Sequence, residues 1–267
     1  MTDDSLVGRS AIVTGGGSGI GRAIVLELAA AGVNTLIAGR RRDALDETVR
    51  LAKSPGHLAV LPADIRDPAD RTRIVATAVE QFGGLDILVN NAGVTSLTPL
   101  LDYTVEEWRN VMTTHAEAAF FLAQAAIPEL RKSSQARIIN IGSVYGLLGI
   151  NNDFYGERLP WDNARGAGPV REFAYAATKA ALLQLTRELA TAVGRWGITV
   201  NSVTPGMIPV DANPMPAVTN ERLSRSTPLG RVGRPEEIAT VVCFIAGAGS
   251  SFMTGSEVRV DGGWSIW

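Results

Sequence analysis

The sequence is poor in cysteine, histidine and lysine: among 267 residues it has one cysteine, two histidines and three lysines. Because Cys243 stands alone, no disulfide can form within one chain, and a reducing setting is expected. Cys243 lies in the apolar run 241–245, which predicts a buried and inert thiol rather than a nucleophile. His57 and His115 are far apart in the sequence, so we expect no metal site.

Long apolar runs and runs of one charge are also missing. The longest hydrophobic stretches are too short to span a bilayer, and residues 1–5 lack the basic start and apolar core of a signal peptide. The net charge is -2 and the pI is about 5.8. The segment 40–42 is the one basic tract, so charge gives no case for nucleic acid or an anionic membrane as a partner. We therefore expect a cytoplasmic protein.

Short apolar segments alternate with longer amphipathic ones along the chain. Strands are predicted at residues 11–13, 35–38, 57–61, 85–89, 137–141, 198–203 and 257–260. Helices are predicted at residues 20–31, 43–52, 67–82, 105–114, 116–130 and 174–193. This alternation predicts one α/β domain over residues 1–267, a Rossmann-like doubly wound parallel sheet with helices on both faces.

Two stretches interrupt this alternation. Residues 147–173 are rich in glycine, asparagine, proline and charge, and residues 207–228 contain four prolines. Long loops inside a compact α/β domain usually contribute to function, although loops far from any site are the alternative for each. We interpret the first stretch as an insertion beside an active site and the second as a substrate loop.

A glycine-rich turn, Thr-Gly-Gly-Gly-Ser-Gly-Ile-Gly at residues 14–21, joins the first predicted strand to the first predicted helix. Glycine allows the backbone to turn tightly and approach a pyrophosphate, and a helix N-terminus offers free N–H groups. The position between a strand and a helix strengthens this interpretation as a dinucleotide site. Its glycines at 15, 19 and 21 do not follow the commoner Gly-x-Gly-x-x-Gly spacing.

The end of the second predicted strand bears on which dinucleotide binds. A carboxylate there would hydrogen-bond the ribose 2′-hydroxyl of NAD, but the sequence has Gly39 followed by Arg40. A guanidinium can pair with a 2′-phosphate, which favours NADP, with NAD possible. The alternative is that Arg40 and Arg41 are a solvated helix start.

Tyr175 and Lys179 lie four residues apart on a predicted helix, which places both side chains on one face. A free phenol has a pKa of about 10. A nearby ammonium and the positive charge of a bound nicotinamide favour the phenolate and lower that pKa, as acid–base work near neutrality requires. Tyr145 and Tyr155 have no lysine at this spacing. Tyr175 is therefore the predicted acid–base group.

These motifs resemble the short-chain dehydrogenase/reductase family in its compact form. The resemblance rests on Thr-Gly-x-x-x-Gly-Ile-Gly, on Asn-Asn-Ala-Gly at 90–93 and on Tyr-x-x-x-Lys, and it extends along nearly the whole chain. It implies an oxidoreductase that transfers a hydride between NAD(P)(H) and a small carbonyl or alcohol substrate. It also implies a homotetramer built through helices 116–130 and 174–193. The alternatives are an NAD(P)-binding sensor with little redox activity and an enzyme that isomerises or dehydrates sugar nucleotides.

The resemblance also implies roles for individual residues. Ser143 would orient the reacting oxygen, Tyr175 would exchange its proton, and Lys179 would bind the nicotinamide ribose. Asn90 would brace the fold. Cofactor contacts are implied at Gly15, Ser18, Gly19, Ile20, Gly21, Arg40, Asp64, Ile65, Asn91, Ala92, Gly93, Tyr175, Lys179, Pro205, Gly206 and Ile208.

Three features depart from the family pattern. Ser143 and Tyr175 are 32 residues apart, far more than is usual, so residues 147–173 are expected to wall or cover the substrate pocket. His115 occupies the place of the asparagine of the catalytic set, which is thought to hold a water beside the lysine. We hypothesise that neutral His115 supports proton relay and that its protonation in the working pH range stops it; the alternative is a packed imidazole bonded to a backbone carbonyl. Val210 replaces a threonine that often touches the cofactor.

Overall fold

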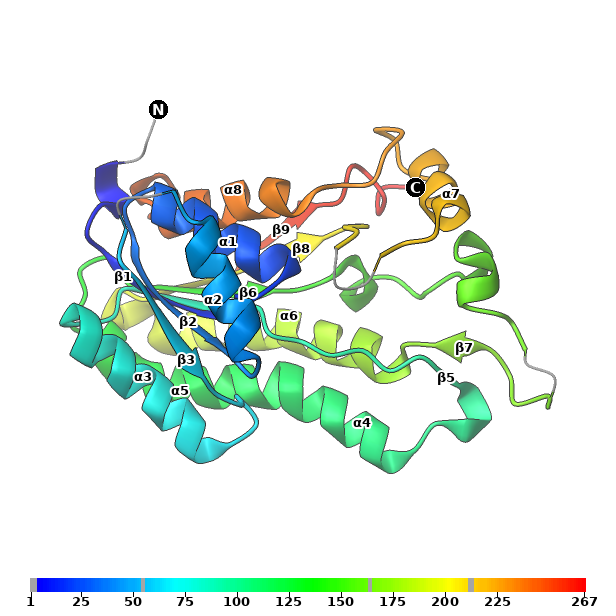
Figure 1. The fold of residues 1–267 in the computed structure, drawn as a ribbon, viewed down its shortest axis with the longest axis horizontal. Coiled ribbons are helices and arrows are strands. Elements are labelled where there is room, and N and C mark those ends of the chain that lie inside the picture. Colours follow the sequence, from blue (N-terminus) through cyan, green and yellow to red (C-terminus); the bar gives the residue numbers. More distant parts are fainter. Residues whose placement is uncertain (1–3, 54–55, 163–164, 211–213) are drawn as a thin grey trace.

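The computed structural model describes residues 4–53, 56–162, 165–210 and 214–267, and in these residues seven strands form one parallel sheet (Figure 1). The strands are β1 (Ser10–Thr14), β2 (Asn34–Gly39), β3 (Leu58–Pro62), β4 (Ile87–Asn90), β6 (Arg137–Ile141), β8 (Thr199–Pro205) and β9 (Glu257–Val260). Their order is β3-β2-β1-β4-β6-β8-β9. The chain winds outward in both directions from β1 and β4, which opens a crevice at the carboxyl ends of these strands.

Helices cover both faces of the sheet, as predicted (Figure 1). One layer contains α1 (Gly19–Ala30), α2 (Arg42–Leu51) and α8 (Pro235–Ala246); the other contains α3 (Pro68–Phe82), α4 (Val105–Met112), α5 (Ala118–Leu130) and α6 (Phe173–Val193). Side chains alternate between the layers, so Ala11 and Val13 of β1 belong to the α1–α8 core whereas Ile12 belongs to the α3–α5 core. The predicted doubly wound α/β fold is confirmed.

Local sequence signals explain several helix ends. The Asp67 carboxylate accepts the N–H of Ala69 at 2.8 Å, and Pro68 occupies the first position of α3. The same helix ends at Gly83, whose φ of 79° is left-handed. Thr104 and Glu107 form a reciprocal capping box at the start of α4.

The region between residues 105 and 130 differs from the prediction of two separate helices. There α4 and α5 are continuous through a π-helical turn, Thr113–Glu117, which contains His115. A π-turn inserts one residue into the helical repeat without interrupting the helix, and such turns occur frequently at functional sites. The apolar pattern of the sequence did not reveal this π-turn, because the helical pattern continues before and after it.

Two helices and a small sheet were missed by the sequence analysis. The helix α8 was not predicted, and α7 (Ala217–Arg225) lies inside the stretch that was interpreted as a loop. The strands β5 (Thr98–Pro99) and β7 (Val170–Arg171) pair antiparallel and tie the end of the insertion to the segment before α4.

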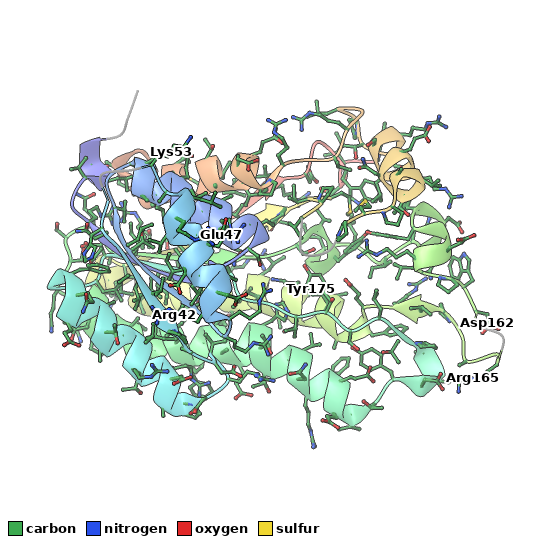
Figure 2. The ribbon with its side chains drawn as sticks, viewed as in Figure 1. Arg42, Glu47, Lys53, Asp162, Arg165 and Tyr175 are labelled. Atoms are coloured by element: carbon green, nitrogen blue, oxygen red, sulfur yellow. The ribbon has the colours of Figure 1, made fainter. Side chains whose placement is uncertain are left out.

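The insertion at 147–173 is structured around a buried amide. The Asn152 side chain donates to the carbonyls of Leu159 at 2.7 Å, Pro160 at 3.2 Å and Val170 at 3.1 Å. In Figure 2 Tyr175 lies in the middle of the molecule on α6, whereas Asp162 and Arg165 lie at its far end. Residues 163–164 of the insertion and 211–213 of the substrate loop lie outside the described residues. Within the described part of the chain, no helix has the length and apolar character needed to span a bilayer.

Candidate active site

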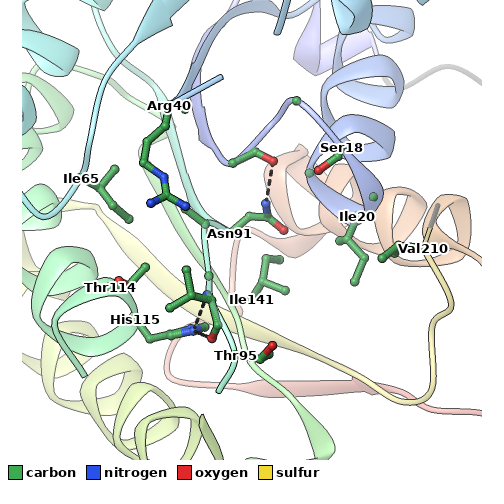
Figure 3. A pocket seen from close by; sticks show the side chains of 18 of the residues that line it. Ser18, Ile20, Arg40, Ile65, Asn91, Thr95, Thr114, His115, Ile141 and Val210 are labelled. Atoms are coloured by element: carbon green, nitrogen blue, oxygen red, sulfur yellow. Dashed lines mark hydrogen bonds between the residues drawn. The ribbon is translucent and has the colours of Figure 1, made fainter. Parts of the chain in front are cut away.

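A cleft of about 510 Å³ lies at the carboxyl ends of β1, β2, β4, β6 and β8 (Figure 3). Every residue that the sequence analysis assigned to catalysis or cofactor binding lines it. From the glycine-rich turn and the ends of β2 and β3 these are Gly15, Ser18, Gly19, Ile20, Gly21, Arg40, Asp64 and Ile65. From the strand ends and α6 they are Asn91, Ala92, Gly93, His115, Ser143, Tyr175, Lys179, Pro205, Gly206 and Ile208.

Glycines of the glycine-rich turn occupy positions where a side chain would be strained or would clash. Gly15 and Gly19 have φ angles of 68° and 51°, in the left-handed region that favours glycine. A Cβ on Gly21 would lie 2.3 Å from the carbonyl oxygen of Gly15. The first turn of α1 carries no acidic residue. Its N-terminus therefore offers the cleft a positive dipole end, which suits a pyrophosphate.

Two asparagines brace the site, Asn90 as the last residue of β4 and Asn91 directly after it. The Asn91 side chain donates to the carbonyls of Thr14 at 2.9 Å and Gly15 at 3.3 Å, which fixes the start of the glycine turn (Figure 3). Asn90 turns the other way and donates to Asn140 at 2.9 Å in the core. The bracing role expected of Asn90 is therefore confirmed, and Asn91 braces the turn as well as lining the cleft.

The end of the cleft lined by Arg40 and Asp64 contains an ion pair that sequence analysis missed. Arg66 Nε donates to both carboxylate oxygens of Asp64 at 3.0 Å, and a further Arg66 nitrogen donates to Asn110 at 2.8 Å. The hydrogen bonds from Arg66 lower the pKa of Asp64, which keeps this carboxylate ionised and an acceptor. The sequence did contain a signal for this pair: the acidic Asp64 and the basic Arg66 stand two positions apart just after a predicted strand.

Arg40 and Arg41 are exposed at the mouth of the same end. Figure 3 shows the Arg40 side chain extending into the cleft. Within the described residues the Arg40 guanidinium forms no hydrogen bond or ion pair, although its charge acts on Asp64 at longer range. This end of the cleft therefore has a cation without a short-range partner and, at the tip of β2, no carboxylate.

Ser143, Tyr175 and Lys179 meet where β6 and α6 approach each other. Lys179 Nζ donates to the carbonyl of Ile141 at 2.7 Å and lies 5.5 Å from the centre of the Tyr175 ring. Ser143 Oγ accepts the N–H of Tyr145 at 3.2 Å, which leaves the serine proton available to another acceptor.

Burial dominates the ionisation of this group. It raises the pKa of Tyr175 to about 12, against an opposing hydrogen-bond contribution from Ser143. Burial also lowers the pKa of Lys179 to about 7, because the ammonium loses its hydration. In the protein alone the net shift of the Tyr175 pKa is therefore upward, because desolvation is its largest cause. The predicted lowering by Lys179 together with the positive charge of a bound nicotinamide stays a prediction for the complex.

His115 is 3% exposed and links the π-turn to two parts of the site. Its Nε2 lies 2.8 Å from the carbonyl oxygen and 3.0 Å from the nitrogen of Val94 (Figure 3). Nδ1 has no partner among the described residues. Burial, and next the charge of Lys179, lower the pKa of His115 to about 3. The hypothesis that His115 gains charge in the working range is therefore wrong, whereas the alternative of a backbone hydrogen bond is confirmed.

Two glycines of the site lie against side chains that depart from the family pattern: Gly93 against His115 and Gly19 against Val210. A Cβ on Gly93 would lie 2.4 Å from Cε1 of His115, so the imidazole fills the space that glycine leaves. A Cβ on Gly19 would lie 3.0 Å from Val210. Val210 thus packs on the glycine turn through methyl groups, where a threonine would present a hydroxyl.

Comparison with known proteins gives family matches along the chain. The profile for short chain dehydrogenase matches residues 9–155, and the profile for enoyl-(acyl carrier protein) reductase matches residues 161–265. A Pseudomonas aeruginosa 3-oxoacyl-[acyl-carrier-protein] reductase of rhamnolipid biosynthesis is 36% identical over 98% of both chains. A tropinone reductase homologue of Arabidopsis thaliana is also 36% identical, over 98% of this chain and 94% of the relative.

Solved structures agree with this chain over almost its full length. The NADP complex of Pseudomonas aeruginosa RhlG superposes with a TM-score of 0.86 at 35% identity and covers 99% of both chains. A short-chain type dehydrogenase/reductase from Mycobacterium marinum superposes with a TM-score of 0.84 at 30% identity, over 99% of this chain and 98% of the other.

Proposed function

Because the chain belongs to the short-chain dehydrogenase/reductase family, we propose that it is an NADP-dependent carbonyl reductase or alcohol dehydrogenase with Tyr175 as acid and base. Family membership supports the coarser activity, NAD(P)-dependent oxidoreduction of a carbonyl or alcohol group. One observation carries the finer proposal: Ser143, Tyr175 and Lys179 line the same cleft as the glycine-rich turn. Acid–base groups thus lie beside a site shaped for a dinucleotide.

The residues present fit the dinucleotide. The N-terminus of α1 and the glycine-rich turn would hold the pyrophosphate, and Asp64 and Ile65 the adenine. Lys179 would bind the nicotinamide ribose, and Pro205, Gly206 and Ile208 the nicotinamide. When bound, the cofactor supplies or accepts the hydride.

Residues of the chain itself would transfer the proton that accompanies the hydride. In the reducing direction the Tyr175 hydroxyl donates to the oxygen of the new alcohol, and in the oxidising direction the phenolate removes that proton. Ser143 Oγ accepts from Tyr145, so its own O–H acts as a donor. In the protein alone that donor favours the phenolate of Tyr175, and with a substrate bound it would donate to the reacting oxygen and orient it. A positive charge on Lys179 favours the phenolate, and burial opposes both charges.

His115 acts in this proposal as a positioning residue. A pKa of about 3 keeps the imidazole neutral at working pH. The ring contacts Val94 on one side and Tyr175 on the other, so it sets the distance between the segment after β4 and the phenol. The family has an asparagine at this position. Here the imidazole of His115 would fill that space and stay uncharged.

The preference for NADP rests on charge. The tip of β2 carries Gly39 rather than an acid, and Arg40 beside it is exposed, with no hydrogen bond or ion pair to the described residues. A 2′-phosphate would supply a bidentate partner for that guanidinium. The RhlG structure, which contains NADP, supports the same choice by analogy.

Homotetramer formation and a cytoplasmic location stay predictions. Phe121 on α5 is 40% exposed, and Phe244 on α8 is 50% exposed. Both lie on outer helices, where a second copy of the chain would cover them.

The test of the proposal is a panel of ketones and secondary alcohols assayed with NADPH, NADH and their oxidised forms. Nicotinamide absorbance reports turnover in either direction. Carbonyl reduction that depends on NADPH supports the proposal, whereas binding of the cofactor without turnover of any carbonyl or alcohol favours the sensor alternative.

A further inference from the structure

A second cavity, of about 450 Å³, lies beside the catalytic cleft and is lined by rings. Its walls include Tyr145, Phe154, Trp264, Trp267 and Leu148. Among the described residues that line it, none has a charged side chain. A volume of this size matches the pockets that hold small organic ligands, which are also mainly apolar.

This cavity adjoins the catalytic residues. Tyr145, Phe154 and Trp264 belong to the same apolar cluster as Tyr175. The backbone N–H of Tyr145 is bonded to Ser143, so the wall of the cavity begins two residues after the serine that faces the reacting oxygen. The aromatic cluster that lines the cavity thus continues to the ring of Tyr175 in the catalytic cleft.

The aromatic walls are held in place, and Asn151 and Ser226 add two uncharged polar side chains to the described lining. The hydroxyls of Tyr145 and Tyr155 hydrogen-bond each other, and the Tyr155 hydroxyl also contacts Met207 Sδ at 3.3 Å. Phe154 and Trp264 pack edge to face with centroids 4.9 Å apart. Because the phenol groups satisfy each other, Tyr145 presents ring surface, and burial raises its pKa far above the usual value, so it stays neutral.

We propose that this cavity binds an uncharged, ring-bearing part of the substrate, so that the enzyme prefers bulky neutral ketones or secondary alcohols to short oxo acids. The inference rests on the proposed function and names its substrate class. Apolar rings gain by leaving water and by packing on aromatic walls. A carboxylate would lose its hydration in a cavity whose described lining residues include no cation.

The activity test compares three carbonyl compounds with NADPH: 2-tetralone, butanone and acetoacetate. The ring ketone should have a kcat/KM at least about tenfold above that of either small compound. Equal values for all three would overturn the inference and leave the reductase proposal standing. No turnover of any of them would count against the reductase proposal, and the cavity is then tested by binding.

Binding is tested with a matched pair of variants. Leu148 lines the cavity and is 37% exposed, whereas its neighbour Leu147 is 38% exposed and outside the lining. Both positions are open enough for an arginine to reach solvent. Quenching of tryptophan fluorescence measures the affinity for 2-tetralone with or without turnover.

Leu148→Arg should weaken 2-tetralone binding about tenfold and improve acetoacetate relative to butanone, because it places a cation in the cavity wall. Leu147→Arg should leave these affinities at wild-type values. The NADPH affinity of both variants should be unchanged, since neither position lines the dinucleotide cleft. Equal 2-tetralone affinities for the two variants would overturn the inference.

Discussion

The imidazole of His115 meets the phenol ring of Tyr175 edge to face, with ring centroids 5.4 Å apart and planes at 87°. The contact depends on the π-turn at Thr113–Glu117, which carries the histidine toward α6. On the other side the same imidazole excludes any side chain at position 93. One aromatic residue thus fixes the spacing between the segment after β4 and the proposed acid–base group.

Replacing the phenol hydroxyl tests the proposed chemistry. Tyr175→Phe keeps the ring that packs on His115 but removes the exchangeable proton. We expect kcat to fall at least about a hundredfold with cofactor affinity nearly retained. Steady-state kinetics together with titration of NADPH fluorescence measure both quantities. Turnover comparable to the wild type would assign the proton transfer to another group.

Cofactor selection is tested at the tip of β2. Gly39→Asp adds a carboxylate that repels a 2′-phosphate and can accept from a 2′-hydroxyl. The added Cβ would lie 3.3 Å from Leu45, a contact that a small shift of the leucine relieves. The ratio of kcat/KM for NADPH to that for NADH should fall at least about tenfold. A wild-type enzyme that already prefers NADH would contradict the interpretation of Gly39 and Arg40.

The insertion is tested through its buried amide. Asn152→Ala removes the amide donor from the carbonyls of Leu159 and Val170, while the Pro160 carbonyl keeps the N–H of Val170. Each buried group left unsatisfied costs about 1–3 kcal/mol. We expect a lower unfolding free energy and a raised KM for the carbonyl substrate, with the KM for NADPH changed little. The exposed neighbour Asn151, whose side chain accepts one bond from Asp153, gives the control Asn151→Ala. Equal urea midpoints for the two variants would mean that the amide does not hold the insertion.

Assembly is tested at the exposed ring of α5. Phe121→Arg would place a charge where a second copy is expected to pack, so the mass measured by light scattering should fall below that of the tetramer. The wild type should be tetrameric at micromolar concentration. A wild-type monomer would refute the predicted interface.

Much of the fold and the membership of the site followed from local patterns. The strand ends, the glycine turn and the Tyr-x-x-x-Lys spacing are short-range signals, and in a parallel sheet the carboxyl ends of neighbouring strands necessarily share one edge. The pKa values of the site residues could not be predicted from such local patterns. The pKa of Tyr175 depends on how many groups from distant segments remove water from the phenol, and the sequence shows only that Lys179 is near.

The burial of His115 is a second property that the sequence did not indicate. Comparison with the family pattern placed it beside the lysine, and the usual pKa of a free histidine, about 6.5, suggested titration in the working range. The structure surrounds the imidazole with β4, α6 and the π-turn and gives it a single backbone partner, Val94. Nothing in the sequence indicates the π-turn, so the depth of burial was not predictable.

Protonation of His115 should be visible as a pH dependence of stability. The folded pKa is about 3 and the unfolded reference value is 6.5, so between these values the unfolded chain binds the extra proton. The contribution to stability is then complete above pH 6.5 and decreases as the pH falls, by about 1.4 kcal/mol for each pH unit. Between pH 6.5 and pH 5 the wild type should lose about 2 kcal/mol from this residue alone.

His115→Asn removes the titrating group and should flatten this part of the profile, measured as urea unfolding free energies at a series of pH values. The chain provides a matched control, because His57 is its other histidine and is exposed. His57→Asn should therefore keep the wild-type slope. Equal slopes for wild type and His115→Asn would contradict a buried neutral imidazole. The same burial predicts that His115→Asn leaves the acidic limb of the pH–rate profile unshifted, since a group that stays neutral cannot produce it; a shifted limb would restore a titrating His115 to the mechanism.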